Sequence, residues 1–593
     1  MAKKTSSSSN SDPIVLALVQ NRLDQIAVNM GWVMIRSARS PIFNQSHDFS
    51  CFITDSIGNL ISQADGIPIH TGGGGIAIRS LLKKFSNKVY PGDIFLLNDP
   101  YVAGGNHLPD YVIARPVFFN SSLIAFSCNR AHQSDIGGGA AGTYNPEATE
   151  IFHEGLRIPP IRLSNKGKLR EDILELILLN SRCPDLMEGD LYAMMGSTEI
   201  GSQQILDIVK QYGLKTTLKS FEGILDHSDQ LMRASIYDVK DGEYVGSESF
   251  ENDCFDKVDV KINVKIIIKN DTLFVDFDGT SEQIKGFKNS SLANTHSAVY
   301  TAVASFFDQK IPRNEGTFRC IKINAPLGTL VNAKYPAPVT MCTVFPAHEI
   351  IHACWWALGQ AVPERNCAGW GKNSFPNASG LRSDGTTWVM YNWGGLSGAG
   401  AVNGRDGFNQ IGPLITLGGL TIPNAESYER LYPVQVIKQE FRCDASGVGK
   451  FRGGSGIIYE AYFEEPVEYS FRAEGLARDT GKGVLGGYDG KKGKVELSFE
   501  GQETKNIIPP DYGLMRVQPN KLKIVSPAGG GFGDPLERDF NLVLRDVKDE
   551  IISLDFAKEH YGVLFNKGSF QVNIIETKKL RKIKKDNRNK LFS

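Results

Sequence analysis

Residues 107–135 read HLPDYVIARPVFFNSSLIAFSCNRAHQSD, with two apolar stretches on either side of a short polar one. The stretches 111–119 and 123–129 are rich in β-branched and aromatic residues, and Asn120-Ser121-Ser122 between them is typical of a turn. This pattern predicts a β-hairpin. If the turn is centred on Ser121, Asp110 faces His132 across the strand pair, with Cα atoms about 4.5–5.5 Å apart. The two ends of the segment therefore meet.

Both ends of this hairpin carry an H-x-x-D element, one from His107 to Asp110 and one from His132 to Asp135. Imidazole and carboxylate groups are ligands of divalent Zn, Mn or Fe ions. The sequence therefore predicts one divalent metal ion, held by His107, Asp110 and His132. Asp48, at the mouth of an earlier hairpin, is a further candidate ligand. The alternative is that these residues are surface histidines and turn-capping aspartates, but two such elements joined by one hairpin favour the metal.

Outward from the hairpin, the chain mixes helical and strand patterns. A strand–turn–strand pattern covers residues 49–62, and from about residue 238 alternating strand patterns dominate. Residues 375–425 are rich in Gly and Asn and predict long ordered loops. Helical spacing of apolar residues is found at 13–39, 77–85, 171–180, 192–212, 295–307, 350–361 and 541–561.

A chain of 593 residues is too long for one ordinary hydrophobic core. We therefore expect a mixed α+β, multi-domain and β-rich fold. The expected parts are a disordered N-terminus (1–12), a metal-bearing α/β domain (13–237), a β-rich part with inserted helices (238–540), and a helical C-terminal segment with a basic tail (541–593).

Composition excludes several classes of protein. The formal net charge is -1, from 65 basic and 66 acidic residues, which argues against nucleic-acid binding. The basic run at 578–585 is interpreted as a solvated, frayed end. Nine cysteines without regular spacing favour reduced thiols and a cytoplasmic location. No uninterrupted apolar run of roughly 18 residues is present, so we expect no membrane span.

Three glycine clusters, 72–75, 137–139 and 529–531, match neither the P-loop nor the dinucleotide-binding pattern. We interpret them as tight turns that need positive φ. At 72–75, the alternative is a helix start that receives an anion. No nucleophile elbow is recognisable, and Cys128 is interpreted as a buried thiol.

A further pattern consists of segments that follow one another along nearly the whole chain. They are Asp48 to Ser50, Asp55 with Gly58, Ile67 to His70, Asn98 to Tyr101, Gly104 to Asp110, Ala131 to Gly138, Pro336 to Val339, Arg452 to Gly456, Gly529 to Arg538 and Tyr561 to Val563. In this order they resemble the hydantoinase B/5-oxoprolinase family, over roughly residues 13–564. Two features depart from the family pattern, Asn106 in place of a small hydroxyl residue and the glycine-rich run 72–75, and both bear on the substrate more than on the metal.

The resemblance implies a subunit that works with a partner. The family includes B subunits of ATP-dependent hydantoinases and lactamases, half of the fused 5-oxoprolinases, and related subunits of acetone and acetophenone carboxylases. It implies a metal at His107, Asp110 and His132, with Asp48 as a further ligand in lactamase-type members. It also implies that ATP is bound by an A-type partner subunit, in a hetero-oligomer.

These observations lead to three functional hypotheses. The first is ATP-dependent hydrolysis of a cyclic amide, in which the metal activates water and His70 or Asp135 acts as a base. The second is ATP-dependent carboxylation of a ketone, and the third is a non-catalytic scaffold with a structural metal. A chain shorter than the large subunits of acetone carboxylases favours hydrolysis over carboxylation. An open coordination position would favour catalysis over the scaffold.

Overall fold

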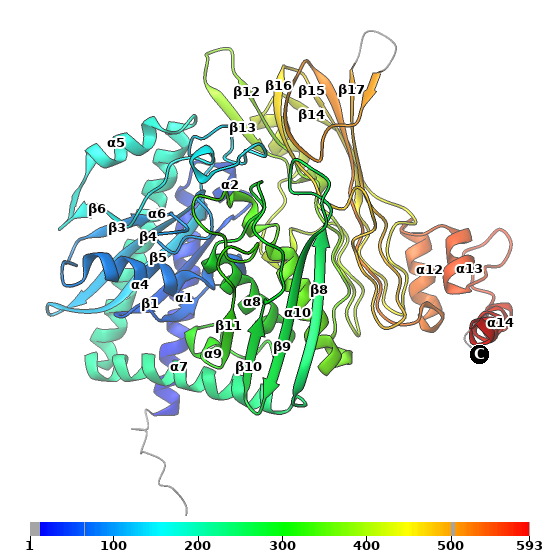
Figure 1. The fold of residues 1–593 in the computed structure, drawn as a ribbon, viewed down its shortest axis with the longest axis horizontal. Coiled ribbons are helices and arrows are strands. Elements are labelled where there is room, and N and C mark those ends of the chain that lie inside the picture. Colours follow the sequence, from blue (N-terminus) through cyan, green and yellow to red (C-terminus); the bar gives the residue numbers. More distant parts are fainter. Residues whose placement is uncertain (1–11, 65, 500–504, 592–593) are drawn as a thin grey trace, which may run out of the picture.

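The computed structural model describes residues 12–64, 66–499 and 505–591, and it has the mixed α+β, multi-domain architecture expected from the sequence (Figure 1). The disorder expected for residues 1–12 concerns a segment outside these ranges, apart from Asp12. Asp12 caps the first helix, because its carboxylate accepts a hydrogen bond from the backbone N–H of Ile14. Among the described residues, no helix is both long enough and apolar enough to cross a membrane.

Residues 13–237 fold around one antiparallel sheet. Its strands are β1 (Phe49–Asp55), β2 (Leu60–Gln63), β3 (Ile94–Leu97), β4 (Asp110–Phe119), β5 (Ser122–His132), β6 (Ile161–Asn165) and β7 (Lys168–Leu169). They lie in the order β2-β1-β5-β4-β3-β6-β7, so the β4–β5 hairpin is at the centre. The central position buries both faces of the hairpin, which fits its nearly continuous apolar sequence.

Long helices cover this sheet. They include α1 (Pro13–Ser37) and α6 (Pro184–Tyr212), which pack against each other and against β1, β4 and β5. In α1, Val19, Leu23, Ile26, Met30 and Met34 form the buried stripe that the helical spacing predicted. The remaining helices of this part are α2 (Pro41–Asn44), α3 (Pro68–Thr71), α4 (Gly74–Phe85), α5 (Glu171–Leu179) and α7 (Leu214–Tyr237). Helix α7 has no counterpart in the sequence-based prediction.

A second sheet follows, in the order β11-β10-β9-β8, with β10 and β11 parallel. Its strands are β8 (Gly242–Phe250), β9 (Val260–Lys269), β10 (Thr272–Asp276) and β11 (Ile321–Asn324), and its helices are α8 (Leu292–Phe306), α9 (Glu315–Phe318) and α10 (Ala347–Ala361). Strand β9 alternates between buried and less buried residues, as predicted. Helix α10 packs against β8, β9 and α8.

Two further sheets share one core. Their strands are β12 (Asn377–Leu381), β13 (Thr387–Tyr391), β14 (Val434–Phe441), β15 (Ile457–Phe463), β16 (Val467–Arg472), β17 (Lys494–Phe499), β18 (Lys505–Ile507), β19 (Tyr512–Val517) and β20 (Asn520–Val525), with helix α11 (Ala425–Leu431) alongside. The orders are β13-β12-β16-β19 and β14-β15-β20-β17-β18. Trp388, Tyr459, Tyr469 and Leu522 are among the residues of the common core.

Beyond these sheets, glycine-rich loops lie side by side and are joined by backbone hydrogen bonds. The backbone N–H of Gly454 donates to the Ala399 carbonyl at 2.7 Å, and that of Gly529 donates to the Gly454 carbonyl at 2.9 Å. The prediction of positive φ is wrong for the 72–75 and 529–531 clusters. At 529–531 glycine is needed because the chains approach so closely. It is confirmed at Gly137 and Gly138, with φ of 82° and 83°.

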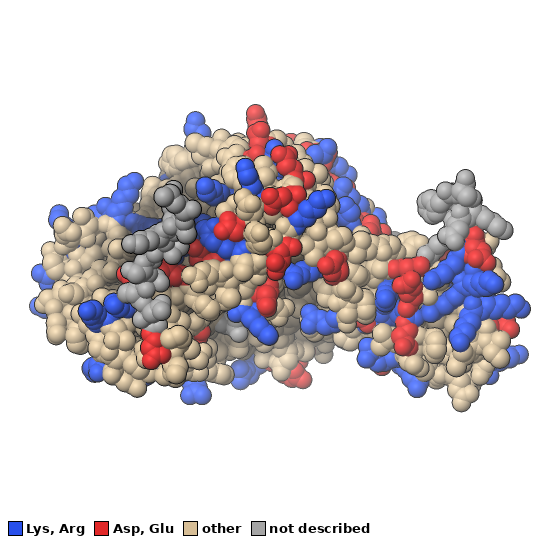
Figure 2. All heavy atoms as spheres, turned by 90° about the horizontal axis from the view of Figure 1, so that it is seen from below, with Lys and Arg blue, Asp and Glu red and all other residues tan. Residues whose placement is uncertain are grey.

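The chain ends in an arm of three helices that projects from the rest of the molecule (Figure 1). They are α12 (Phe540–Lys548), α13 (Leu554–Tyr561) and α14 (Ile574–Leu591). The single helix predicted over 541–561 is therefore two, because Ser553 caps a new helix. The run 578–585, predicted to be frayed, lies within α14, where Arg581 donates to the Tyr561 carbonyl. Figure 2 shows basic side chains gathered on this arm.

Candidate metal centre

The central hairpin has the predicted register at its open end, with Asp110 opposite His132. The turn itself is tighter than predicted. Only Asn120 and Ser121 separate the strands, with φ of 46° and 67°, the left-handed values of a type I′ turn. A bulge between Val117 and Phe118 takes up the extra residue. The two differences cancel, so the pairing near the candidate site is as predicted.

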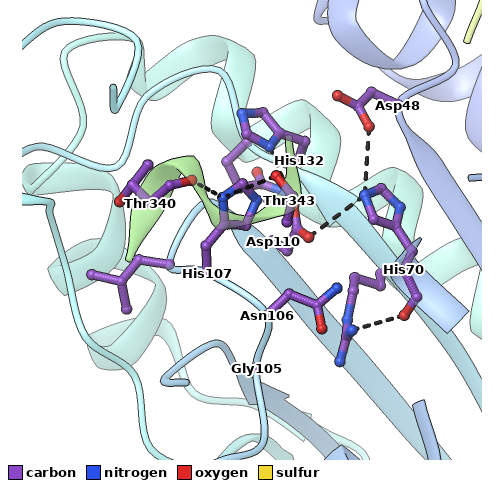
Figure 3. Close-up of polar contacts among 12 residues, drawn as sticks. Asp48, His70, Gly105, Asn106, His107, Asp110, His132, Thr340 and Thr343 are labelled. Atoms are coloured by element: carbon purple, nitrogen blue, oxygen red, sulfur yellow. Dashed lines mark hydrogen bonds and ion pairs between the residues drawn. The ribbon is translucent and has the colours of Figure 1, made fainter. Parts of the chain in front are cut away.

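His107, Asp110 and His132 converge on one point, with one ligand atom from each within 4.8 Å of the others. Asp110 Oδ1 lies 2.7 Å from His107 Nε2 and 3.2 Å from His132 Nδ1 (Figure 3). All three side chains are buried. His107 reaches the hairpin from the preceding loop, which Asn98 braces by donating to the Leu108 carbonyl.

The hydrogen bonds on the outer side of each imidazole fix which nitrogen faces Asp110. His107 Nδ1 donates to the Thr340 carbonyl at 2.5 Å, so Nε2 is the nitrogen that would bind a metal in place of a proton. Tyr391 donates its hydroxyl hydrogen to the Gly142 carbonyl at 2.8 Å, so that its oxygen accepts from His132 Nε2 at 3.2 Å. Asp110 Oδ2 is buried and has no hydrogen-bond partner. Two imidazoles, each held from outside, and a carboxylate are a donor set that fits a divalent cation.

The electrostatics of the group favour positive charge at this point. Burial alone would lower the pKa of His107, but the Asp110 carboxylate and the hydrogen bonds to Asp110 and Thr340 outweigh it and raise this pKa above its ordinary value. Burial would likewise raise the pKa of Asp110, but the His107 and His70 imidazoles hold it well below its usual range.

His70 and Asp48 lie at the edge of the three-residue group. His70, on α3, places Nε2 3.5 Å from Asp110 Oδ2 and 3.6 Å from Asp48 Oδ1 (Figure 3). Arg130 holds this helix by donating to the His70 carbonyl at 2.7 Å. Burial raises the pKa of Asp48 to about 6 and lowers that of His70 to about 4. The structure thus brings both residues near the group without including either in it.

Asp135, the other predicted base, is placed differently. Its Oδ1 accepts from the backbone N–H groups of Gly137 and Arg182, at 3.0 and 2.9 Å. Its Oδ2 accepts from Gly142 N and Arg182 Nη1, at 3.0 and 3.1 Å. Among the contacts of the described residues, none joins Asp135 to His132. The carboxylate fixes the loop that follows β5 instead.

Several residues around the centre were not predicted from the sequence. The Tyr144 ring stacks on the His132 imidazole, with centroids 5.6 Å apart and an interplanar angle of 16°. The Arg472 guanidinium carbon lies 3.6 Å from the Tyr144 ring centroid. Tyr391 and Arg472 come from β13 and β16, which reach the centre from the far end of the chain. No local sequence signal marks either of them.

Helix α10 carries His348-Glu349-Ile350-Ile351-His352, whose spacing is that of zinc proteases. The structure gives His352 and Glu349 other partners. His352 Nε2 accepts from the Trp370 N–H at 3.1 Å, and Glu349 forms a buried ion pair with Lys372 at 2.8 Å. Nε2 of His352 and the Glu349 carboxylate are therefore both occupied.

A cleft of about 580 Å³ adjoins α3, the helix that carries His70. Pro68 and Thr71 of this helix are among its lining residues, together with aromatic rings such as Trp370 and the arginines Arg365 and Arg405. The cleft is thus both apolar and cationic.

Comparison with known proteins identifies the family. The model of the hydantoinase B/oxoprolinase family matches residues 12–535. The chain belongs to this family. The sequence-based resemblance is thereby confirmed.

Relatives of known name lie within this family. The chain is 34% identical over 568 residues to the beta subunit of caprolactamase from Pseudomonas jessenii, covering 94% of this chain and 96% of the relative. The crystal structure of ATP-dependent caprolactamase from that organism superposes with a TM-score of 0.86 at 31% identity, over 97% of this chain and all of the matched one. The B component of a putative D-/L-hydantoinase from a Pseudomonas species is 32% identical, over 96% and 98% of the two chains.

A nucleotide-free acetone carboxylase structure also superposes, with a TM-score of 0.87 over 98% of this chain and 84% of the other. At 20% identity, this likeness shows the fold alone. The family fold therefore occurs with two kinds of ATP-dependent chemistry.

Proposed function

We propose that this chain is the metal-bearing B-type subunit of an ATP-dependent hydrolase of cyclic amides of the hydantoin, 5-oxoproline or lactam type. It acts in a hetero-oligomer with an ATP-binding A-type subunit. The observation that carries the proposal is the convergence of His107, Asp110 and His132 in one buried group. Similarity to a caprolactamase subunit along nearly the whole of both chains supports the reaction class.

The proposed ligands of one Zn, Mn or Fe ion are His107, Asp110 and His132, with Asp48 as the fourth. When bound, such an ion supplies Lewis acidity and makes water a better nucleophile at neutral pH. The Thr340 carbonyl and the Tyr391 hydroxyl keep the two imidazoles in the orientation that this role needs.

His70 is the proposed general base. Its Nε2 lies 3.5 Å from Asp110 Oδ2 and 3.6 Å from Asp48 Oδ1. Burial lowers the pKa of His70, so the imidazole is neutral and can accept a proton, and the Asp110 carboxylate partly offsets this lowering. Asp135 is the weaker candidate, because its carboxylate already accepts hydrogen bonds from Gly137, Gly142 and Arg182.

An unstrained amide is a poor electrophile, so its hydrolysis needs activation by ATP. This sequence has no recognisable phosphate loop, so we assign ATP binding to the partner subunit. In the proposed reaction, the partner phosphorylates the amide oxygen, and water then adds to the carbonyl carbon. The C–N bond breaks with its electron pair going to nitrogen, which takes up the protons of the added water, and a second water hydrolyses the resulting acyl phosphate to carboxylate and phosphate. The proposal predicts that the isolated chain neither hydrolyses ATP nor opens a ring.

Ketone carboxylation is the competing function, favoured by the shared fold with acetone carboxylase. The test is to assay the chain with its A-type partner, ATP and one metal at a time, on lactams, hydantoins and 5-oxoproline, and separately on ketones with bicarbonate. Ring opening that requires both subunits supports the hydrolase. Bicarbonate-dependent consumption of a ketone would establish the carboxylase, and full activity after metal removal would leave only the scaffold role for the metal.

A further inference from the structure

Arg472 is one of the largest fully buried side chains of the protein, at 1% exposure, and it has no carboxylate partner among the described residues. Its Nε donates to the Phe375 carbonyl at 3.2 Å, and its Nη2 donates to Asn377 Oδ1 at 2.6 Å. Its Nη1 is buried without a hydrogen-bond partner. A buried charge is normally paired, because leaving it uncompensated is costly. The guanidinium therefore has one nitrogen without a hydrogen-bond acceptor and a positive charge without a carboxylate partner.

Another buried arginine of this chain shows the usual solution. Arg538, at 0% exposure, donates to both Asp406 and Asp546, at 2.7 and 2.6 Å. Those carboxylates fully compensate its charge within the fold. Around Arg472 the neighbours are instead neutral rings, with Tyr144 at 3.6 Å and Phe375 at 4.5 Å from its guanidinium carbon.

The position of Arg472 connects it to the metal centre. Its guanidinium stacks on Tyr144, and Tyr144 in turn stacks on the His132 imidazole. The free donor therefore belongs to the surroundings of the centre.

We propose that Arg472 is the anion-binding residue of this site, and that its free Nη1 donates to an oxyanion of the substrate. The proposal rests on the proposed function, in which the ring arrives carrying a phosphate. Guanidinium groups bind phosphate and carboxylate through charged hydrogen bonds. The oxyanion is either the phosphate of the activated amide or a carboxylate on the ring itself. In the first case, Arg472 makes the site select activated rings over free ones.

The test compares the wild-type protein with Arg472→Met, which keeps apolar volume on Tyr144 but removes the charge, and with Arg472→Lys, which keeps the charge but loses the planar fork. Arg516→Met is the matched control, because Arg516 lies on the neighbouring strand β19, pairs with Glu468 at the surface, and is 86% exposed. The readouts are metal content, calorimetric binding of inorganic phosphate to the metal-loaded chain, and turnover with the partner subunit.

We expect Arg472→Met to keep its metal and to bind phosphate roughly 30-fold more weakly or worse, as removing one member of a buried charged hydrogen bond does. Turnover should fall equally for a neutral lactam and for 5-oxoproline if phosphate is the anion. If the ring carboxylate is the anion, only 5-oxoproline turnover falls and phosphate binding is unchanged. Arg516→Met should match the wild type in every readout.

Phosphate binding and turnover of both rings at wild-type levels in Arg472→Met would overturn the proposal. If that variant does not fold or loses its metal, Arg472→Lys decides in the same assays. Weaker binding of phosphate or of 5-oxoproline by the folded, metal-loaded Lys variant supports an anion site, and unchanged binding of both refutes it. Phosphate binding is measured without any ring substrate, so this arm stands even if no cyclic amide is hydrolysed.

Discussion

At the scale of single residues, Asp110 is the residue that contacts both histidines of the candidate metal centre. Its Oδ1 faces a nitrogen of both His107 and His132, and its Oδ2 is buried without a hydrogen-bond partner. We expect Asp110→Asn to lose the metal and with it all measurable turnover, because the amide removes the only charged ligand of the three. The fold should persist, since a chain of this size does not need a metal to bury its core. Elemental analysis, circular dichroism and coupled turnover check this.

Asp135→Asn is the matched control, because it makes the same chemical change three residues after His132. The Asp135 carboxylate accepts hydrogen bonds from Gly137, Gly142 and Arg182. Its replacement should keep the metal and lower the free energy of unfolding by about 1–3 kcal/mol, as expected for buried donors left unsatisfied. Metal retained in Asp110→Asn and lost in Asp135→Asn would reverse the assignment.

Tyr391 provides a second prediction at this scale. Its hydroxyl oxygen accepts from His132 Nε2 and so orients the nitrogen that faces Asp110. Tyr391→Phe should weaken metal affinity by roughly 10–100-fold without unfolding the chain. A competitive chelator titration measures the affinity. Tyr469→Phe, which removes the hydroxyl bond to Asn520 within the core of the two packed sheets, is the control and should leave the affinity unchanged.

At the scale of elements, the sequence predicted what is local. The hairpin, its register at Asp110 and His132, and the buried stripe of α1 all follow from residue periodicity. Tyr391 and Arg472 could not be predicted, because strand pairing hundreds of residues away places them. Asn377 of β12 pairs with Tyr391 on one side and Ser470 on the other, which brings one end of that sheet to the centre.

The surroundings of Asp135 could not be predicted for the same reason. It lies close to His132 in sequence, but β5 ends at His132 and the chain then turns away. The predicted boundaries at residues 237 and 540 stay predictions.

The hairpin turn yields the third prediction. Ser121 has φ of 67°, a left-handed conformation that costs a residue with a Cβ about 1–2 kcal/mol, and glycine avoids this cost. Part of the gain is lost because glycine is more flexible in the unfolded chain. Ser121→Gly should therefore stabilise the hairpin by up to about 1 kcal/mol, seen as slower amide hydrogen exchange in β4 and β5. Metal affinity should not change, since β1 and β3 hold the register from both sides. Faster exchange would show that the Ser121 side chain contributes more than its strain costs.

At the scale of the whole molecule, the glycine-rich loops connect the two packed sheets to the C-terminal arm. Gly529 is at their crossing. Its N–H donates to the Gly454 carbonyl, and its own carbonyl accepts from the Gly447 N–H. A Cβ added at Gly529 would lie 1.9 Å from the Ala399 carbonyl oxygen, a distance that only movement of the backbone can relieve. Because each of these loops is held by hydrogen bonds to the next, such a movement propagates across all of them.

We therefore expect Gly529→Ala to destabilise the protein by more than about 4 kcal/mol. Losses of this size are seen only for substitutions that severely disrupt packing. The matched control is Gly196→Ala within helix α6, where the added Cβ would lie 3.9 Å from its nearest neighbour, Val33 Cγ1. That change should stabilise the helix by about 0.5–1 kcal/mol, because alanine is the better helix former. Thermal melting of both variants is the measurement. Equal melting temperatures would mean that the loops can separate freely, and that their glycines serve some purpose other than close packing.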